Sequence, residues 1–206
     1  MAETVIYFVR HAQSHPKVEL TEPEWPLSDK GIQQAAAIAP IIEELGIDEV
    51  YTSPYSRCVA TIKPYCEAAG KEFRLNPELR ERRISAGWID DFTEVWRKSW
   101  EDYSYALPNA ESSAACQKRM FAAVTDIADR HAGKTLALSS HGNAISLFLN
   151  AVDPRFAFAQ ASAMRNPDIF RVVRAADGFR LDREFRTGTA FDRIATGVHE
   201  TPGIKT

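Results

Sequence analysis

The sequence predicts a three-layer α/β/α sandwich, in which helices cover both faces of a mostly parallel, doubly wound sheet with an antiparallel edge strand. Short apolar segments rich in Val, Ile, Tyr and Phe alternate with longer segments in which apolar residues recur every three or four positions. Near the end of the chain, two apolar segments flank Ala176-Asp177-Gly178, a sequence typical of a hairpin turn.

The first expected strand runs from Thr4 to Val9, an apolar segment that is too short for a helix. A helix is expected next, because Ser28 can cap its N-terminus and Asp29 places a negative charge in its first turn. Gly46 marks its end. The apolar residues expected along this helix are Ile32, Ala35, Ala36, Ala39 and Ile42.

The second expected strand is Glu49 to Thr52, and Ser53-Pro54 then predicts a helix with Ser53 as N-cap and Pro54 as first residue, ending at Ala69-Gly70. The remaining expected elements are a weaker strand at Lys71 to Leu75, a helix at Ala114 to Arg130, a buried strand at Thr135 to Ser139, a short helix at Asn143 to Asn150, and two strands at Ile169 to Arg174 and Phe179 to Phe185.

We interpret residues 1–206 as a single domain, because this length suits one sizeable core. The regular alternation breaks after Arg80, so an inserted, lid-like region is expected at about residues 82–110. An aromatic stripe in this region is most typical of a face packed on the core, with a lid over the site as the competing interpretation. Residues 186–206 contain several Gly and Pro and no periodicity, which predicts an irregular tail.

The composition excludes several classes of partner and location. Basic and acidic side chains number 25 and 28, so no overall positive field favours nucleic acid or an anionic membrane as a partner. No apolar run approaches the roughly 20 residues that span a bilayer, and the first residues lack a signal-peptide pattern, so a cytoplasmic location is expected. The cysteines Cys58, Cys66 and Cys116 lack Cys-x-x-Cys spacing and are expected to be reduced and packed.

The candidate site residues follow the expected strands, because ligands of α/β sheets collect at the carboxyl ends of parallel strands. In chain order, the segments at these ends are Arg10-His11, Ser53 to Arg57, Leu79 to Glu81, and His141 to Asn143. Four separate strand ends therefore bring two His, two Arg and one Glu to the same edge.

In this order and context, the segments resemble the motifs of the histidine phosphatase superfamily, also called the phosphoglycerate mutase-like family. The resemblance runs from Val5 to about Asn150. The matching motifs are Arg-His at Arg10-His11, Ser-Pro-x-x-Arg at Ser53 to Arg57, Leu-x-Glu at Leu79 to Glu81, the second His-Gly at His141-Gly142, and a degraded Pro-Gly-Gly-Glu-Ser at Pro108 to Ser112. The resemblance implies a phosphoglycerate mutase-like fold.

These residue types also suit phosphoryl transfer on chemical grounds. Arginine neutralises phosphate oxygens through paired hydrogen bonds, which is the role we assign to Arg10 and Arg57. A neutral imidazole can attack phosphorus when its other nitrogen is held by a hydrogen bond, and the resemblance implies this role for His11. It also implies that a charged His141 stabilises the transferring group. Glu81 is the candidate acid and base, with Glu78 as its near rival.

Other residues are expected to contact the substrate beyond its phosphate. They are Ser14, Lys17, Arg82, Gly142 and Asn143, and within the insertion Trp88, Arg83 and Lys98 could contact the leaving group. Ala12 stands where the family usually has Gly, a change that we expect to be tolerated. Lys17 stands where many members of the family have Asn, so the substrate class is not carried over from the resemblance. His11 and His15 have the spacing of a metal-binding pair, but no Glu follows His11 and Pro16 opposes a continuing helix, so no metal site is expected.

The sequence thus predicts a metal-independent phosphomonoesterase of the histidine acid phosphatase type, which hydrolyses a small phosphorylated metabolite through phosphohistidine at His11 without a cofactor. The alternative is a cofactor-dependent phosphoglycerate mutase-type phosphotransferase, although the chain lacks the long basic, Pro-rich insertion typical of such mutases. A remote alternative is a non-catalytic module that binds a phosphorylated ligand. Both alternatives would use the same phosphate-binding residues as the phosphomonoesterase.

Overall fold

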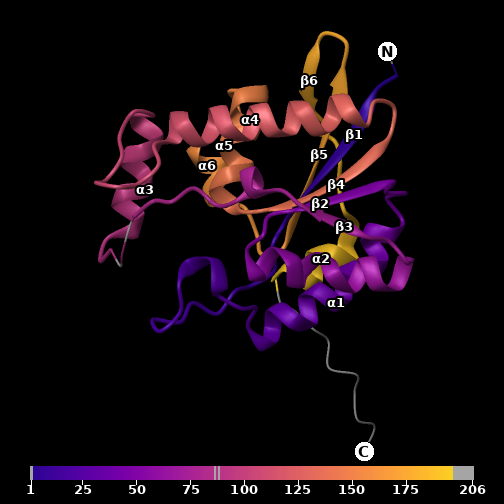
Figure 1. Ribbon diagram of the computed structural model, residues 1–206, viewed down its shortest axis with the longest axis horizontal. Coiled ribbons are helices and arrows are strands. Elements are labelled where there is room, and N and C mark those ends of the chain that lie inside the picture. Colours follow the sequence, from indigo (N-terminus) through magenta and orange to yellow (C-terminus); the bar gives the residue numbers. More distant parts are fainter. Residues whose placement is uncertain (1, 86, 88, 197–206) are drawn as a thin grey trace, which may run out of the picture.

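The computed structural model describes residues 2–85, 87 and 89–196, and within this part a six-stranded sheet forms the centre of the molecule (Figure 1). In spatial order the strands are β3 (Phe73–Leu75), β2 (Glu49–Thr52), β4 (Thr135–Ser140), β1 (Thr4–Arg10), β5 (Asp168–Ala175) and β6 (Gly178–Leu181). The first four are mutually parallel, and β5 is antiparallel to both of its neighbours. The expected sheet, mostly parallel with an antiparallel hairpin at one end, is confirmed.

Helices cover both faces of the sheet (Figure 1). One layer contains α1 (Asp29–Glu43), α2 (Ser56–Ala69) and α7 (Gly188–Thr196), and the other contains α4 (Ser113–Arg130) and α5 (Gly142–Val152). Because side chains alternate along a strand, Ile6 and Phe8 of β1 pack in the core under α4 and α5, while Tyr7 and Val9 pack in the core under α1 and α2. The three-layer prediction is confirmed.

The first helix starts as expected, since the side chain of its N-cap Ser28 accepts a hydrogen bond from the Gly31 amide. Its buried face differs from the prediction. Ile32 is 58% exposed and Ala36 is also exposed, whereas Gln34 is buried. A Cβ atom at Gly31 would lie 2.0 Å from the Gln13 carbonyl oxygen, so only glycine allows this close packing of the helix against the segment after β1.

The start of the second helix was predicted wrongly. It begins at Ser56 with Tyr55 as N-cap, rather than at Pro54 with Ser53 as N-cap, and ends as expected at Gly70, whose φ is +62°. Ser53 is fully buried and its hydroxyl faces His141 instead. A side chain taken for a local cap is therefore part of the long-range packing.

The region after β3 contains α3 (Phe92–Glu101), and its Trp96 and Trp100 pack on the core cluster as expected, whereas Phe92 is exposed. Trp96 and Trp100 contact the ring of Phe158 in α6 (Phe158–Ser162), a short helix that the sequence did not predict. The Tyr103 hydroxyl donates to Asn150 Oδ1 in α5. Trp88 lies outside the described residues.

The expected irregular tail at 186–206 is wrong in part, because residues Gly188–Thr196 form α7. Phe191 is fully buried beside α1 and α2, and Ile194 and Ala195 pack against the same cluster. These residues have the i, i+3, i+4 spacing of a short amphipathic helix. Residues 197–206 lie outside the described part of the chain.

Two expectations from composition can be compared with the structure. Cys58, Cys66 and Cys116 are buried and form no disulfide, as expected. In the described residues, no helix combines the length and the apolar character that crossing a membrane requires.

Candidate active site

The site begins where three neighbouring strands end. Arg10 of β1 is in register with Ser140 of β4, and Ser139 of β4 is in register with Thr52 of β2. The residues that follow these strands therefore converge, and the rings of His11 and His141 lie 5.3 Å apart between centroids. Arg57, from the first turn of α2, places its Nε 3.3 Å from His11 Nε2. The predicted meeting of two His and an Arg at this edge is thus present.

The orientation of the His11 ring is fixed by the backbone of the next residue. Its Nδ1 donates to the Ala12 carbonyl over 2.7 Å, so its Nε2 carries the lone pair and accepts from Arg57 Nε. Burial lowers the pKa of His11 well below its usual value, and the positive charges of Arg57 and Arg10 lower it further. The ring is therefore a neutral imidazole with a defined tautomer, as a nitrogen nucleophile requires.

Three side chains hold the segment that carries His11. Thr61 Oγ1 accepts from the Ala12 amide, Gln34 Oε1 accepts from the Gln13 amide, and Asn166 Nδ2 donates to the His11 carbonyl. These residues come from α2, α1 and the segment before β5. Sequence reasoning missed all three, and the available signal was a polar Gln34 among apolar residues of one helix.

The amide of Gln34 also donates to the carbonyls of Asn166 and Ile194. Replacing Gln34 by leucine leaves these carbonyls and the Gln13 amide unpaired in a buried place. We expect the free energy of unfolding to fall by about 2 to 3 kcal/mol and the Tm by roughly 4 to 12 °C, measured by thermal denaturation. Gln33→Leu on the exposed side is the control and should change the Tm little; equal losses in both variants would contradict the assignment.

The guanidinium group of Arg10 is oriented so that one edge can bind an anion. Its Nη1 donates to the carbonyls of Met164 and Arg165 at 2.7 and 3.2 Å, which fixes the guanidinium. Its Nε is buried without a partner, and within the described residues the edge formed by Nε and Nη2 donates no hydrogen bond. A buried, unpaired cationic edge is what a phosphate would satisfy through two hydrogen bonds.

Gly142 gives Arg10 its place, because a Cβ atom there would lie 3.1 Å from Cζ, Nε and Nη2 of Arg10. Gly142→Ala should push the guanidinium aside and raise the KM for a phosphate monoester roughly tenfold. The Tm should stay the same or rise, because alanine suits the first turn of α5 better than glycine does. Steady-state kinetics and thermal denaturation check the two effects separately. An unchanged KM would mean that Arg10 is free to shift at no cost.

Arg57 is only 3% exposed and is already bound by its own chain. Its Nη2 pairs with Glu22 Oε1 and its Nη1 donates to the Glu22 carbonyl, each over 2.8 Å. The guanidinium also lies over the rings of Trp25 and Tyr55. Glu22 belongs to the short 3-10 helix η1 (Glu22–Glu24), and no sequence signal pointed to it. Burial and the nearby Glu81 carboxylate raise the pKa of Glu22, and Arg57 opposes this effect.

His141 is fully buried, and its Nε2 lies 2.8 Å from the Ser53 hydroxyl and 3.3 Å from Cys58 Sγ. Burial lowers its pKa well below the usual value, and Arg57 and His11 add to this effect. The charged His141 that the resemblance implies concerns the ring beside a phosphoryl group, where a phosphate dianion would favour its protonation, so this role stays a prediction.

Glu81 lies at the start of α5, where its carboxylate accepts hydrogen bonds from the amides of Asn143 and Ala144, and another from the Arg82 amide. The helix N-terminus favours a negative group at this position. The rival Glu78 is exposed and pairs with Arg80. The structure therefore places Glu81, and not Glu78, at the N-terminus of α5, the helix whose N-cap is His141.

The other residues that we expected to contact the substrate lie in different surroundings. Asn143 is buried at the start of α5, and its Oδ1 has no partner among the described residues. Ser14 forms an isolated bridge with Leu27, and Lys17 is half-buried nearby, where its carbonyl accepts from Trp25 Nε1. Arg82 is buried, and its Nη1 donates to Ser113 Oγ at the start of α4, so its contact with a substrate stays a prediction.

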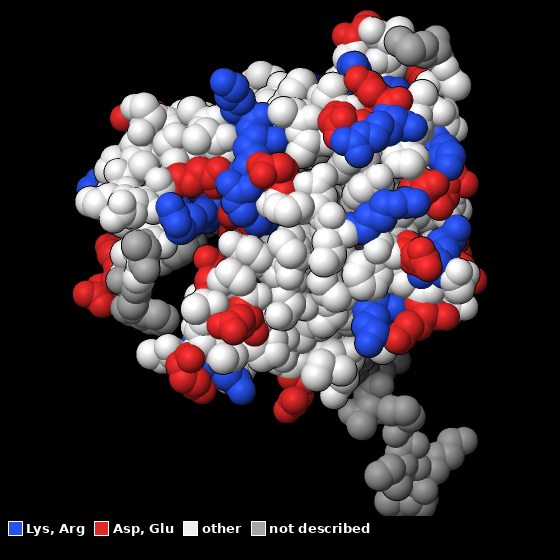
Figure 2. Space-filling view, in the orientation of Figure 1, with Lys and Arg blue, Asp and Glu red and all other residues white. Residues whose placement is uncertain are grey.

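Of the other cations expected near the leaving group, Arg83 is exposed and Lys98 pairs with Glu94 on α3. On the face seen in Figure 2, the surface is hollowed between the α3 region and the segment after β1, and acidic side chains lie along this rim. Among the described residues, no group of three or more His, Cys, Asp or Glu side chains is arranged to hold a metal ion.

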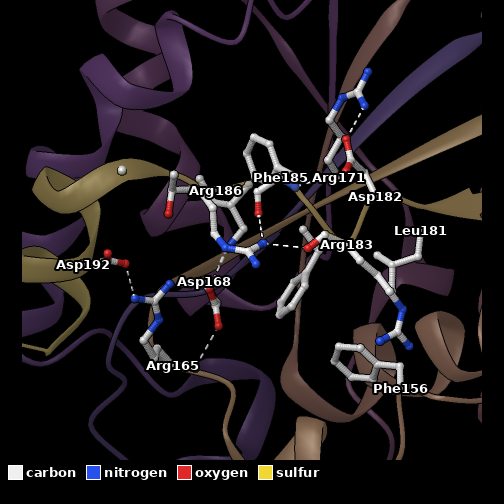
Figure 3. Close-up of a pocket in the computed structure, with 14 residues that line it drawn as sticks. Phe156, Arg165, Asp168, Arg171, Leu181, Asp182, Arg183, Phe185, Arg186 and Asp192 are labelled. Carbon is white, nitrogen blue, oxygen red and sulfur yellow. Dashed lines mark hydrogen bonds and ion pairs between the residues drawn. The ribbon is translucent and has the colours of Figure 1, made fainter.

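A separate cavity of about 540 Å³ lies beside β5 and β6, and none of the predicted site residues lines it (Figure 3). Its charged side chains pair with one another: Arg165 with Asp168 and Asp192, and Arg171 with Asp182. The carbonyl of Arg165 accepts from Arg10 Nη1, so the wall of this cavity also supports the site.

Comparisons with known proteins agree with this geometry. The model of the histidine phosphatase superfamily (branch 1) matches residues 6–186. A probable phosphoglycerate mutase GpmB of Escherichia fergusonii is 29% identical over 179 residues, covering 81% of this chain and 83% of the relative.

Two solved structures share the fold at low identity. A mycobacterial glucosyl-3-phosphoglycerate phosphatase has a TM-score of 0.70 and 20% identity, and the match covers 87% of this chain and 97% of that one. A phosphoserine phosphatase from Entamoeba histolytica has a TM-score of 0.73 and 20% identity, covering 91% and 99%. The expected phosphoglycerate mutase-like fold is confirmed, and the chain belongs to branch 1 of the histidine phosphatase superfamily.

Proposed function

We propose that this enzyme is a metal-independent phosphomonoesterase that hydrolyses a small phosphorylated metabolite through a phosphohistidine on His11. The observation that carries the proposal is the state of the His11 ring. Its Nδ1 is tied to the Ala12 carbonyl, and its lone pair at Nε2 points to Arg57. A nucleophilic nitrogen thus lies beside the cation that would hold the phosphoryl group.

In the first step, His11 Nε2 attacks phosphorus, the P–N bond forms, and the bond from phosphorus to the leaving-group oxygen breaks. Arg10 and Arg57 neutralise the phosphoryl oxygens, and His141 stabilises the charge that develops on them. Glu81 gives its proton to the leaving alkoxide. In the second step, Glu81 takes a proton from water, the water oxygen attacks phosphorus, and the P–N bond breaks to release inorganic phosphate and neutral His11.

The alternative is phosphoryl transfer to a second hydroxyl of the substrate, as in a mutase, and the name of the curated relative favours it. Phosphoglycerate carries a carboxylate besides its phosphate. The Glu22 carboxylate interacts both with Arg57 and with the Glu81 carboxylate at this site, and these two acids add negative charge where such a substrate needs positive charge. This arrangement supports hydrolysis of a substrate without that carboxylate.

The two functions differ in their product. With 3-phosphoglycerate and a bisphosphoglycerate primer, a mutase forms 2-phosphoglycerate, whereas the phosphomonoesterase releases inorganic phosphate from an aryl phosphate and from members of a phosphometabolite panel. We expect release of phosphate, at a rate unaffected by EDTA. Isomerisation that exceeds phosphate release, or loss of activity on chelation, would overturn the proposal.

A further inference from the structure

The two arginines of the site are in different states. Both can hold two phosphate oxygens, either across Nη1 and Nη2 or across Nε and Nη2. In Arg10 the Nε–Nη2 edge donates no hydrogen bond to the described residues. In Arg57, Nη2 belongs to both edges and is paired with Glu22 Oε1 over 2.8 Å. Phosphate can therefore bind Arg10 directly, whereas it must displace the Glu22 carboxylate before it can bind Arg57 through two hydrogen bonds.

We infer that Glu22 is an internal competitor of the substrate phosphate, a carboxylate that pairs with Arg57 and sets the affinity of the enzyme for phosphate monoesters. The inference rests on the proposed function in one respect, namely that Arg57 is a phosphate ligand. A carboxylate carries one negative charge and a phosphate dianion carries two, so phosphate displaces Glu22 and the competition lowers affinity without blocking the site.

The contacts of η1 indicate how the exchange takes place. Glu22 holds Arg57 through both its side chain and its backbone carbonyl. The carboxylate can therefore release Arg57 in two ways: its side chain rotates away while the carbonyl contact stays, or the backbone of Glu22 moves as well. The helix is bonded internally, since Glu24 Oε2 accepts from the amide and hydroxyl of Thr21. Because these bonds do not involve Arg57, η1 can shift as a unit when phosphate takes the guanidinium.

The charge of Glu22 makes the competition depend on pH. Arg57 and Tyr55 face it from the start of α2, and Glu81 faces it from the segment before the insertion. Burial and Glu81 raise the pKa of Glu22. Above that pKa Glu22 is ionised and competes, and below it Glu22 is neutral and releases Arg57. Competition is therefore strongest at the alkaline end and fades as the pH falls.

The test compares the wild-type protein with Glu22→Gln and with the matched control Glu24→Gln. Glu24 lies two positions away on η1 and makes its hydrogen bonds to Thr21, which a glutamine oxygen can still accept. Binding of inorganic phosphate is measured by titration calorimetry at several pH values between about pH 5 and pH 8. Titration of free phosphate is the same for all three proteins, so it cancels in ratios of Kd.

We expect Glu22→Gln to bind phosphate roughly 5- to 30-fold more tightly than the wild type at pH 8, with the ratio falling as the pH is lowered. Glu24→Gln should bind like the wild type. On an aryl phosphate, Glu22→Gln should lower KM and leave kcat within about threefold. Equal or weaker phosphate binding by Glu22→Gln at pH 8, an equal gain in Glu24→Gln, or binding by none of the proteins would overturn the inference. Calorimetry needs no turnover, so tighter binding without hydrolysis would uphold the role of Glu22 and overturn only the proposed function.

Discussion

His11→Ala is expected to lower kcat/KM for an aryl phosphate by about 10³- to 10⁵-fold, because it removes the atom that forms the covalent bond to phosphorus. The fold should remain, since the ring makes one bond to its own neighbour and one to Arg57. Rapid quenching of the wild-type enzyme should trap a phosphoryl label that is stable in base and labile in acid. The variant should carry no such label.

His15→Ala is the matched control for this experiment. His15 lies four positions along the same segment and is exposed, so its removal should change kcat/KM by less than about twofold. Turnover retained by His11→Ala would exclude a phosphohistidine at this position. Label retained by that variant would place the covalent intermediate on another residue.

The second large effect is expected for Glu81→Gln. An alkyl phosphate needs a proton on its leaving oxygen, so its kcat should fall by about 10²- to 10⁴-fold. With p-nitrophenyl phosphate, the p-nitrophenolate leaves without protonation. The rate of phosphoryl transfer to His11 should therefore change little, whereas the rate of hydrolysis of the phosphohistidine by water should fall. Stopped-flow measurements should then show a burst of p-nitrophenolate equal to the enzyme concentration, followed by slow turnover.

Glu78→Gln separates this chemical role from a general loss of charge. Glu78 is three positions away and exposed, and its ion pair with Arg80 lies outside the site, so kcat should change by less than about twofold for both substrates. Equal losses for alkyl and aryl phosphates in Glu81→Gln, without a burst, would contradict the acid and base assignment. The carboxylate would then serve only to position α5.

The fold was largely predictable where apolar periodicity decides the structure. β2 begins and ends at the expected residues, and α4 begins one residue early. The errors have physical causes. Ser53 has the local chemistry of a helix cap, but its hydroxyl is used by His141, and α2 starts later. Short elements such as α7 are decided by tertiary packing, here the burial of Phe191, rather than by propensity.

The candidate site was predictable only in part. Arg10, His11 and His141 follow strand ends, so topology alone brings them together. Glu22, Thr61 and Asn166 were not predictable, because each reaches the site from a segment whose place depends on the finished fold. The lowered pKa of His141 was also not predictable, because the pKa of a buried ring depends on its burial and on every charge around it.

The anchoring of Arg10 by the carbonyls of Met164 and Arg165 has a consequence for biosynthesis. Arg10 leaves the ribosome well before its partner, because 154 positions separate it from Met164. At ~5 to 20 residues per second, translation takes about 8 to 30 s to supply that partner. A nascent chain halted before Met164 therefore contains His11 and both arginines but lacks the carbonyl groups that orient Arg10. We expect the proposed phosphatase activity to appear abruptly, late in synthesis, rather than grow with chain length.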